Sequence, residues 1–314
     1  FNRDVDGIIK YLSERNVRYG NRVAWLGFNH YIAIEIFFAC AAIGAVFVPI
    51  NWRLSADEID GILEDCNPSL IVFQDKGFRG GLNYKCKDMV SLATLIEKAS
   101  DGYVNKISHE YGSTEDSIVL ISYTSGSTGK PKGVMISQLA IYCNYQMSVE
   151  AHSLSENDSL INVLPIFHVG GLNILVTAGL LVGARVFLHQ KYELKKVISD
   201  LAAVDCVILV PAILNELLRE DEFVKNDFPK LRTISIGSTI VPLEMIKKTL
   251  SLGINIIQLY GSTEVTPFAI HQRDSDSKNF LGSIGKSGSS CQIKLIDPSG
   301  NEVKQGKVGE ICVR

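Results

Sequence analysis

Short runs of apolar and β-branched residues alternate with longer stretches of helical periodicity along most of this chain. Many of the runs are apolar on both faces, as expected for strands that helices cover on each side. This alternation predicts an α/β fold with mostly parallel sheets. We expect strands at residues 22–28, 69–75, 116–123, 159–166, 184–190, 206–210, 232–237 and 254–260, and helices at 30–44, 56–66, 89–99, 139–151, 194–204, 212–220 and 243–252.

Two local signals refine this prediction. Ser55-Ala-Asp-Glu58 is a capping-box sequence, which predicts a helix that begins directly after Ser55. After about residue 280 the pattern changes, and glycines separate short strand-like segments at 292–297 and 310–314. These segments predict the beginning of a small antiparallel unit. Because the chain begins at Phe1 and stops inside a strand-like run, we interpret it as a fragment.

Composition excludes several classes of protein. The 314 residues are 46% hydrophobic and 21% charged, with a formal net charge of −3, so no basic surface for nucleic acid is expected. The seven cysteines form no CxxC pair, which favours free thiols in the cytoplasm over a disulfide framework or a zinc site.

The longest apolar stretch, residues 31–50, contains Glu35, Gly44 and Pro49, and therefore predicts a buried helix leading into a strand instead of a transmembrane segment. The oligomeric state cannot be read from the sequence.

Residues 123–134 combine glycines, hydroxyl side chains and lysines directly after a strongly apolar strand. Successive backbone N–H groups in such a loop form an anion-binding nest, so a polyphosphate is the expected ligand. The loop is not a Walker A motif, because Pro131 follows Lys130 and residues 133–136 have the pattern of a second strand. The alternative is a flexible polar surface loop. The candidate contacts are Thr124, Ser125, Gly126, Ser127, Thr128, Gly129, Lys130 and Lys132.

This string resembles the phosphate-loop signature of the adenylate-forming superfamily, which includes acyl-CoA synthetases, luciferases and the adenylation domains of peptide synthetases. Further matching segments follow in the family's order, from about residue 20 to the end. The resemblance implies that residues 1–314 are a large N-terminal AMP-binding domain, with two interleaved, layered α/β subdomains over about 1–280 and an incomplete β-barrel subdomain over about 281–314. It also implies catalytic roles for Thr128 and Lys130, and a C-terminal domain that is absent from this chain.

Residues 258–267 are similar to the second nucleotide motif of that family. A strand leads to a turn at Gly261, so the aromatic face of Tyr260 can stack on adenine. Glu264 is a hard oxygen ligand suited to Mg²⁺, and the resemblance gives it this catalytic role with Thr124 as a second contact near the metal. Taken alone, the segment could be a strand and turn with a solvated glutamate. The other candidate nucleotide contacts here are Gln258, Ser262 and Thr263.

Residues 235–239 end another predicted strand and resemble the family segment that lies along the adenine and the acyl pocket. They add Gly237, Ser238 and Thr239 to the candidate ATP contacts. Many relatives have Ala-Pro where this chain has Thr239-Ile240, so the backbone contacts of this segment are expected more than its side-chain contacts. The alternative is a plain turn from strand to loop.

The segment Leu164–Gly171 resembles the motif in which an aromatic residue or histidine closes on the carboxylate and the phosphate. The resemblance makes His168 a catalytic candidate and places His168, Val169, Gly170 and Gly171 in the acyl pocket. A lone histidine is otherwise most often a satisfied core residue. Adenylation domains for α-amino acids usually have Asp at the position of His168, and burying an ammonium group without a carboxylate is costly. An acyl or aryl acid is therefore favoured over an amino acid.

The resemblance implies an AMP-forming acid–thiol ligase of fatty acid metabolism or a related pathway. It would use ATP and Mg²⁺ to convert a fatty or aromatic carboxylic acid to acyl-AMP with release of pyrophosphate, and CoA to form a thioester in the complete enzyme. The acid is already ionised at neutral pH, since such groups titrate near ~4, so the first step needs no general base. The family's adenylation lysine belongs to the C-terminal domain, so we expect this fragment to be poorly active or inactive.

Two other functions are open at this point. The first is an adenylating enzyme that passes its acyl group to a carrier protein or to another acceptor. The second, of a different class, is a non-catalytic module that binds a nucleotide or an acyl group. The identity of the acid cannot be read from the sequence, because one methylene group in a pocket changes affinity by only ~1–3 kcal/mol.

Overall fold

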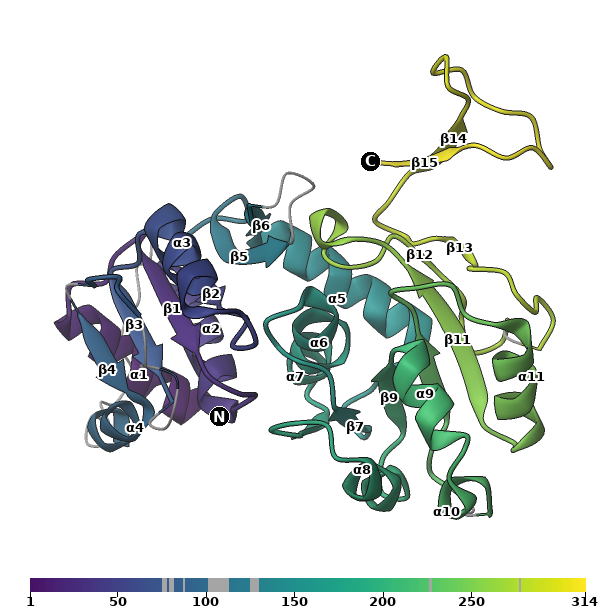
Figure 1. Ribbon diagram of the computed structural model, residues 1–314, viewed down its shortest axis with the longest axis horizontal. Helices are drawn as coiled ribbons and strands as arrows, with labels where there is room; N and C mark the ends of the chain where they lie inside the picture. The colour runs from purple at the N-terminus through teal and green to yellow at the C-terminus, as the bar shows by residue number, and fades with distance from the viewer. Residues whose placement is uncertain are drawn as a thin grey trace. The chain divides into compact units, whose positions relative to one another are not determined.

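The computed structural model describes residues 1–74, 78, 82–86, 88–100, 113–124, 130–225, 228–276 and 278–314. The chain folds into two compact units of mixed α/β structure (Figure 1). Unit 1 contains residues 1–141, 165–168 and 188–191, and unit 2 contains residues 142–164, 169–187 and 192–314.

Unit 1 is built around a sheet with six strands among the described residues, in the order β4-β3-β1-β2-β5-β6. All neighbouring pairs are parallel except β5 and β6, which are antiparallel. The elements are α1 (Asn2–Glu14), β1 (Arg22–Leu26), α2 (Tyr31–Ile43), β2 (Val46–Pro49), α3 (Ala56–Cys66), β3 (Leu70–Phe73), β4 (Met89–Ser91), α4 (Leu92–Ser100), β5 (Ile118–Thr124) and β6 (Lys132–Ser137). The helix that follows, α5 (Gln138–His152), continues into unit 2.

The helix α3 illustrates how the sequence builds this layer. Its apolar residues recur at helical spacing and pack on alternate residues of β1, β2 and β3, which point to one face of the sheet. This burial stabilises the layer by about 25 cal/mol per Å² of apolar surface removed from water. The cluster consists of Ala24, Leu26, Val48, Ile50, Ile59, Ile62, Leu63, Cys66 and Ile71.

The predicted capping box at the start of α3 is confirmed. The Ser55 hydroxyl accepts a hydrogen bond from the Glu58 backbone N–H, and the Glu58 carboxylate accepts one from the Ser55 backbone N–H at 2.9 Å. We expect Ser55→Ala to lower the free energy of unfolding by about 1 kcal/mol, because the Glu58 backbone N–H loses its acceptor. Urea denaturation measures this loss. Ser55→Asp, which restores an acceptor, should recover most of it, and equal midpoints for all three proteins would contradict the prediction.

Unit 2 contains a second sheet, with seven strands among the described residues in the order β13-β12-β11-β10-β9-β7-β8. The central strands β7, β9, β10 and β11 are parallel, and β12 and β13 extend the sheet in antiparallel fashion. The elements are β7 (Ser159–Asn162), α6 (Val169–Leu172), the π-helix η1 (Asn173–Thr177), α7 (Ala178–Val182), β8 (Arg185–Leu188), α8 (Leu194–Leu201), β9 (Cys206–Leu209), α9 (Pro211–Leu217), α10 (Asp221–Lys225), β10 (Thr233–Ile236), α11 (Leu243–Ser251), β11 (Asn255–Tyr260), the 3₁₀ turn η2 (Thr263–Val265), β12 (Ile270–His271) and β13 (Lys286–Ser287).

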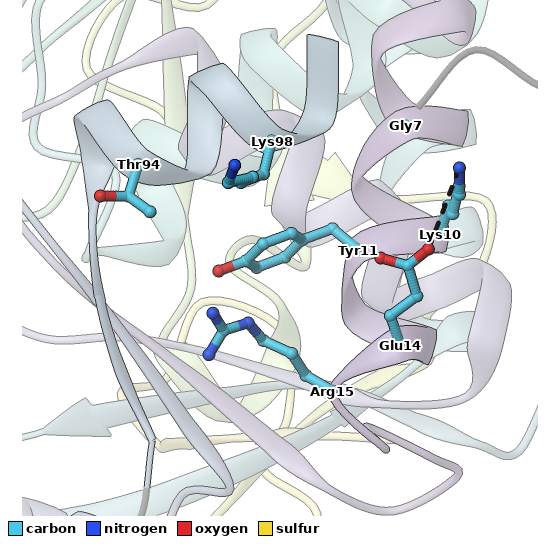
Figure 2. Close-up of a pocket in the computed structure, with 7 residues that line it drawn as sticks. All are labelled: Gly7, Lys10, Tyr11, Glu14, Arg15, Thr94 and Lys98. Carbon is cyan, nitrogen blue, oxygen red and sulfur yellow. Dashed lines mark ion pairs between the residues drawn. The ribbon is translucent and has the colours of Figure 1, made fainter. Parts of the chain in front are cut away.

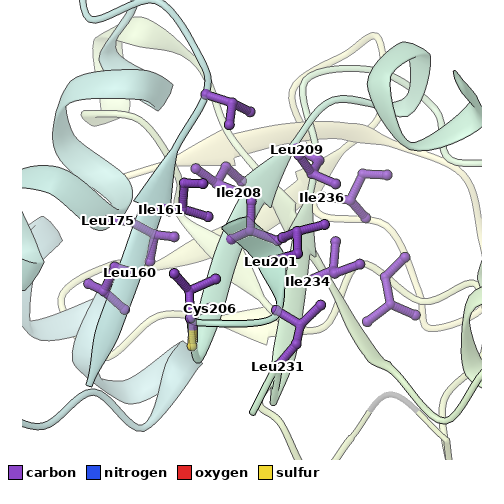
Figure 3. Close-up of a cluster of buried hydrophobic side chains, with 14 of the residues drawn as sticks. Leu160, Ile161, Leu175, Leu201, Cys206, Ile208, Leu209, Leu231, Ile234 and Ile236 are labelled. Atoms are coloured by element: carbon purple, nitrogen blue, oxygen red, sulfur yellow. The ribbon is translucent and has the colours of Figure 1, made fainter. Parts of the chain in front are cut away.

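The core of unit 2 surrounds its parallel strands. Every residue of β7, β9 and β10 is buried, as expected for strands covered on both faces. Figure 3 shows Ile161, Ile208 and Ile234 from these strands among the packed side chains. This core holds the strands rigidly, so the residues at their carboxyl ends are fixed in position.

The predicted fold class is confirmed, and most predicted elements are present with slightly shorter ends. The helix predicted at 89–99 was wrong in its first turn, because Met89–Ser91 pairs with β3 as strand β4 and the helix begins at Leu92. The sequence analysis missed α1 and the helical segment from Val169 to Val182. The two short segments near the end form an antiparallel pair, β14 (Ile293–Ile296) and β15 (Glu310–Val313). Their membership of a barrel stays a prediction.

The long apolar stretch is divided as the sequence predicts. Helix α2 ends at Gly44, which has a left-handed φ of 70°, and β2 follows as a buried strand. No helix within the described residues has both the length and the apolarity to cross a membrane.

Candidate functional site

The glycine-rich segment joins two strands of unit 1, as predicted. Thr124, at the end of β5, lies opposite Lys132, at the start of β6, in the antiparallel register. The Thr124 hydroxyl donates to the Lys132 carbonyl at 3.5 Å, and Lys130 and Lys132 are both exposed. The predicted contacts Ser125, Gly126, Ser127, Thr128 and Gly129 lie outside the described residues. The described residues that flank this segment therefore include two exposed lysines.

The base of this hairpin is fixed by close packing. A Cβ atom on Gly133 would lie 2.8 Å from Ile121 Cγ2 and 3.1 Å from the Tyr123 ring, so glycine permits the strand to pass over these side chains. The Tyr123 hydroxyl donates to Asp65 at 2.5 Å. Burial, followed by this hydrogen bond, raises the pKa of Tyr123, which therefore stays neutral. The strand ends that carry Thr124 and Lys132 are thus held in register.

His168 also belongs to unit 1, where it follows the buried ring of Phe167. The two ring centroids are 4.5 Å apart, and the Arg53 guanidinium lies 5.8 Å from the centroid of Phe167. Part of the His168 ring is exposed. Desolvation of the rest of the ring, and then the charge of Arg53, lower its pKa, so the imidazole is neutral at pH 7.

Arg53 is a candidate that the sequence analysis missed. It follows β2 closely, its guanidinium lies 5.1 Å from the Trp52 ring centroid, and its charge acts on His168. Two aromatic contacts hold an exposed positive charge near His168, for which a contact with a carboxylate and a phosphate stays a prediction. The sequence signal that could have identified Arg53 is the run Asn51-Trp52-Arg53 directly after a buried strand. Residues at the carboxyl ends of parallel strands gather at one edge of a sheet, where ligands bind.

In unit 2, the two predicted nucleotide segments lie at neighbouring strand ends. Strands β10 and β11 are parallel, with Ile236 paired to Gln258, so both chains leave the sheet at the same edge. Gly237 follows β10, and Gly261 follows Tyr260 at the end of β11. Ligands of open α/β sheets bind characteristically beyond the carboxyl ends of the strands.

Two glycines allow the backbones to approach closely at this edge. A Cβ atom on Gly237 would lie 2.4 Å from the Leu259 carbonyl oxygen. A Cβ atom on Gly261 would lie 2.2 Å from the Pro267 carbonyl oxygen and 2.4 Å from Phe268 Cα. Both contacts are with backbone, so neither position accepts a side chain without displacement of a strand or turn.

The side chains at this edge differ in accessibility. The Tyr260 ring is 39% exposed, which leaves one aromatic face available for stacking. Ser238 has a left-handed φ of 76°, and Ser238 and Thr239 are exposed. Gln258 is buried, and its amide nitrogen donates to the Ser283 carbonyl at 2.8 Å, so this side chain holds the following loop. A contact between Gln258 and a nucleotide stays a prediction.

Glu264 presents an ionised carboxylate on the turn η2. Its side chain is exposed, and a hydrogen bond from the Ser262 hydroxyl, followed by one from its own backbone, lowers its pKa. Beside it, Ser262 is exposed and Thr263 is half-buried. An exposed oxygen ligand with full negative charge fits Mg²⁺.

The metal would need ligands besides protein carboxylates. Within the described ranges, no three His, Cys, Asp or Glu side chains are grouped to hold a metal ion. Mg²⁺ commonly binds through one or two protein groups together with substrate phosphates, so this donor set suits a metal that arrives with ATP. Thr124, the other predicted contact, belongs to unit 1, whereas Glu264 belongs to unit 2.

The predicted acyl-pocket residues begin helix α6 of unit 2. Val169 and Gly171 are buried, and Gly170 is half-buried. A Cβ atom on Gly170 would have no neighbour closer than Ile174 Cδ1, at 4.0 Å. Helix α6 continues into the π-helix η1, a distortion that is frequent at functional sites.

Comparison with known proteins identifies the family. The whole chain, residues 1–314, matches the family model described as AMP-binding enzyme. It is 34% identical to an indoleacetate–CoA ligase of Aromatoleum aromaticum and 30% identical to a feruloyl-CoA synthase of an Amycolatopsis species. Each alignment covers 99% of this chain and 63% of the relative. The chain thus spans slightly less than two thirds of the length of these relatives.

Solved structures agree with this assignment. The N-terminal domain of FACL13 from Mycobacterium tuberculosis superposes with a TM-score of 0.88 and 26% identity, over 100% of this chain and 80% of that chain. The o-succinylbenzoate CoA synthetase of Bacillus subtilis, solved with an acyl-adenylate intermediate, gives a TM-score of 0.86 and 26% identity over 99% of this chain and 63% of that one. The chain belongs to the family of AMP-binding enzymes.

Proposed function

We propose that this chain binds ATP with Mg²⁺ and activates a carboxylic acid as an acyl-adenylate. The observation that carries the proposal is the sheet edge of unit 2, where Tyr260, Ser238 and the ionised Glu264 follow two adjacent parallel strands. An aromatic face, hydroxyl donors and a hard oxygen ligand are the groups needed for adenine, phosphate and Mg²⁺ respectively.

The chemistry requires positioning and charge neutralisation more than proton transfer. An oxygen of the substrate carboxylate attacks the α-phosphorus of ATP, and the bond from that phosphorus to the bridging oxygen breaks to release pyrophosphate. Lys130 and Lys132 neutralise the charge on the departing pyrophosphate. When bound, Mg²⁺ would be held by Glu264 and would neutralise phosphate charge. The neutral imidazole of His168 adds no positive charge that would pair with the substrate carboxylate.

We infer that the acid is aromatic, with a fatty acid as the second choice. Two relatives named above are called ligases or synthases for indoleacetate and ferulate, which are aromatic acids. A Cβ atom on Gly170 would meet no atom closer than Ile174 Cδ1 at 4.0 Å, so glycine leaves space for one methyl group beside the predicted pocket. Pyrophosphate release by the complete protein, measured with arylacetic, hydroxycinnamic and straight-chain acids, would rank the substrates. A preference for straight-chain acids would reverse this order.

The complete protein would then transfer the acyl group to CoA, as an AMP-forming acid–thiol ligase in the cytoplasm. All seven cysteines are free, which is consistent with a reducing compartment. A fatty acid–[acyl-carrier-protein] ligase of Streptomyces coeruleorubidus is 28% identical to the chain, so a carrier protein is the second candidate acceptor. An assay of thioester formation with each acceptor distinguishes the two.

The phosphate-loop assignment can be tested by binding alone. A Thr128→Ala/Lys130→Ala double variant should bind Mg-ATP about tenfold more weakly, because one hydroxyl donor and one cation are removed from the triphosphate. Isothermal titration calorimetry on the 314-residue chain measures this change. Lys304→Ala removes one exposed charge elsewhere and should have no effect. Unchanged affinity in the double variant would contradict the loop's role.

A further inference from the structure

Glu35 is a buried carboxyl group in the middle of an apolar helix. It lies on α2 of unit 1, where its neighbours in sequence are almost all apolar, and it is 2% exposed. Its Oε2 atom is buried and has no hydrogen-bond partner among the described residues. Burying a carboxylate without a partner is strongly unfavourable, so a group in this position needs either a proton or a ligand.

Glu35 lines a partly open cavity of about 270 Å³ between three helices of unit 1. Ile8 of α1, Ile32 of α2 and Ile96 of α4 give the cavity an apolar wall. Gly7 keeps α1 close to α4, because a Cβ atom on Gly7 would lie 2.4 Å from the Ala99 carbonyl oxygen. The cavity therefore combines a hydrocarbon surface with one unpartnered acidic group.

Among the described residues, no charged side chain of the cavity lining forms a hydrogen bond with the Glu35 Oε2 atom. Arg3 and Asp4 of α1 contribute one positive and one negative charge to the lining, Tyr31 of α2 is neutral, and the lining residues of α4 are apolar. Burial and then Asp4 raise the pKa of Glu35 to about 7, while the amino group of Phe1 opposes the shift. The carboxyl group can therefore ionise at physiological pH.

A neighbouring cavity of about 440 Å³, which also contains Gly7, shows the contrast (Figure 2). Its cationic side chains each have an acidic partner. Lys10 pairs with Glu14 at 3.9 Å, Lys98 pairs with Glu97 at 3.6 Å, and Arg15 pairs with Asp88. Each cation in that cavity is paired with a carboxylate, whereas the Glu35 Oε2 atom has no hydrogen-bond partner.

We propose that the Glu35 cavity binds a small organic cation, namely a primary ammonium group on a short alkyl chain. The ammonium group would pair with the Glu35 carboxylate, and the alkyl chain would pack on Ile8, Ile32 and Ile96. This site lies between helices α1, α2 and α4 of unit 1 and is independent of the proposed ATP site.

The probe for this site is n-butylamine, with 1-butanol as its neutral counterpart of the same chain length. Ligand-observed NMR on the 314-residue chain at pH 8 should show saturable binding of n-butylamine, weakened about tenfold or more in Glu35→Gln. Binding of 1-butanol should be similar in the two proteins, because it does not depend on the carboxylate. Glu14→Gln removes an acidic group from the neighbouring cavity and should leave n-butylamine binding unchanged.

A pH series on the unmodified chain tests the site without any variant. n-Butylammonium remains charged between pH 5 and 8, so its affinity should fall as Glu35 is protonated below about pH 7. Equal binding of n-butylamine to the original chain and to Glu35→Gln would overturn the proposal, as would affinity that does not change from pH 5 to 8. The absence of any saturable binding would do the same.

Discussion

Replacing Glu264 with glutamine should weaken Mg-ATP binding to the 314-residue chain by about a hundredfold, on the order of 3 kcal/mol. The substitution keeps the shape of the side chain and removes the negative charge that the exposed carboxylate offers to the metal. The affinity for Mg-ATP, measured by calorimetry, reports the loss directly. Glu244→Gln is a matched control, because Glu244 is an exposed carboxylate of the same unit, paired with Lys247 at 2.9 Å on α11.

The metal dependence separates this role from a general effect on the nucleotide site. In EDTA, where ATP is free of Mg²⁺, the original chain and Glu264→Gln should bind ATP equally well, or the variant slightly better, because a repulsive charge is gone. An equal loss of affinity with and without Mg²⁺ would show that Glu264 acts on the structure of the turn and not through the metal. Unchanged affinity with Mg²⁺ would remove Glu264 from the site.

Much of the fold could be predicted because its strands are buried on both faces. Residues 206–209 are an apolar run that only a covered parallel strand or a buried helix explains, and its length decides for a strand. Residues 233–236 alternate polar and apolar side chains, the period of a strand, although all four are buried. Helix α1 was missed although Val5, Ile8 and Leu12 recur at helical spacing, since it lies at the start of the chain and has no side-chain cap. The turn from strand to helix at Ser91–Leu92 depends on pairing with β3, which a local pattern does not contain.

The candidate site was predictable where backbone geometry requires a particular residue. The glycines at 133, 237 and 261 all lie against atoms that exclude a Cβ, so each position requires glycine for the backbone to pass close to its neighbours. The environment of His168 was not predictable, because Arg53 is more than a hundred residues earlier and acts through the tertiary fold. The contact of buried Gln258 with the Ser283 carbonyl was missed because it too forms only in the tertiary fold.

Gly261→Ala should destabilise unit 2 by about 2–4 kcal/mol and abolish the high-affinity binding of Mg-ATP. The added Cβ would meet the Pro267 carbonyl oxygen at 2.2 Å and Phe268 Cα at 2.4 Å. This backbone cannot retreat easily, because Phe268 is buried in the core and the Ala269 N–H donates to the Tyr260 carbonyl at 2.9 Å. The strand end at residue 260 must therefore move, which displaces both Tyr260 and the turn that carries Glu264.

Urea denaturation and Mg-ATP titration of the same preparation test both parts of this prediction. Gly61→Ala is the matched control, because Gly61 is exposed on α3 and an added Cβ meets no atom within 4 Å. That change should stabilise the chain by about 0.5–1 kcal/mol, as alanine favours a helix over glycine, and leave Mg-ATP binding intact. If Gly261→Ala instead unfolds at the original urea concentration and binds Mg-ATP normally, the turn after β11 does not constrain the nucleotide site. If it keeps its stability and loses only binding, the added methyl group acts on the ligand itself and Gly261 contacts the nucleotide directly.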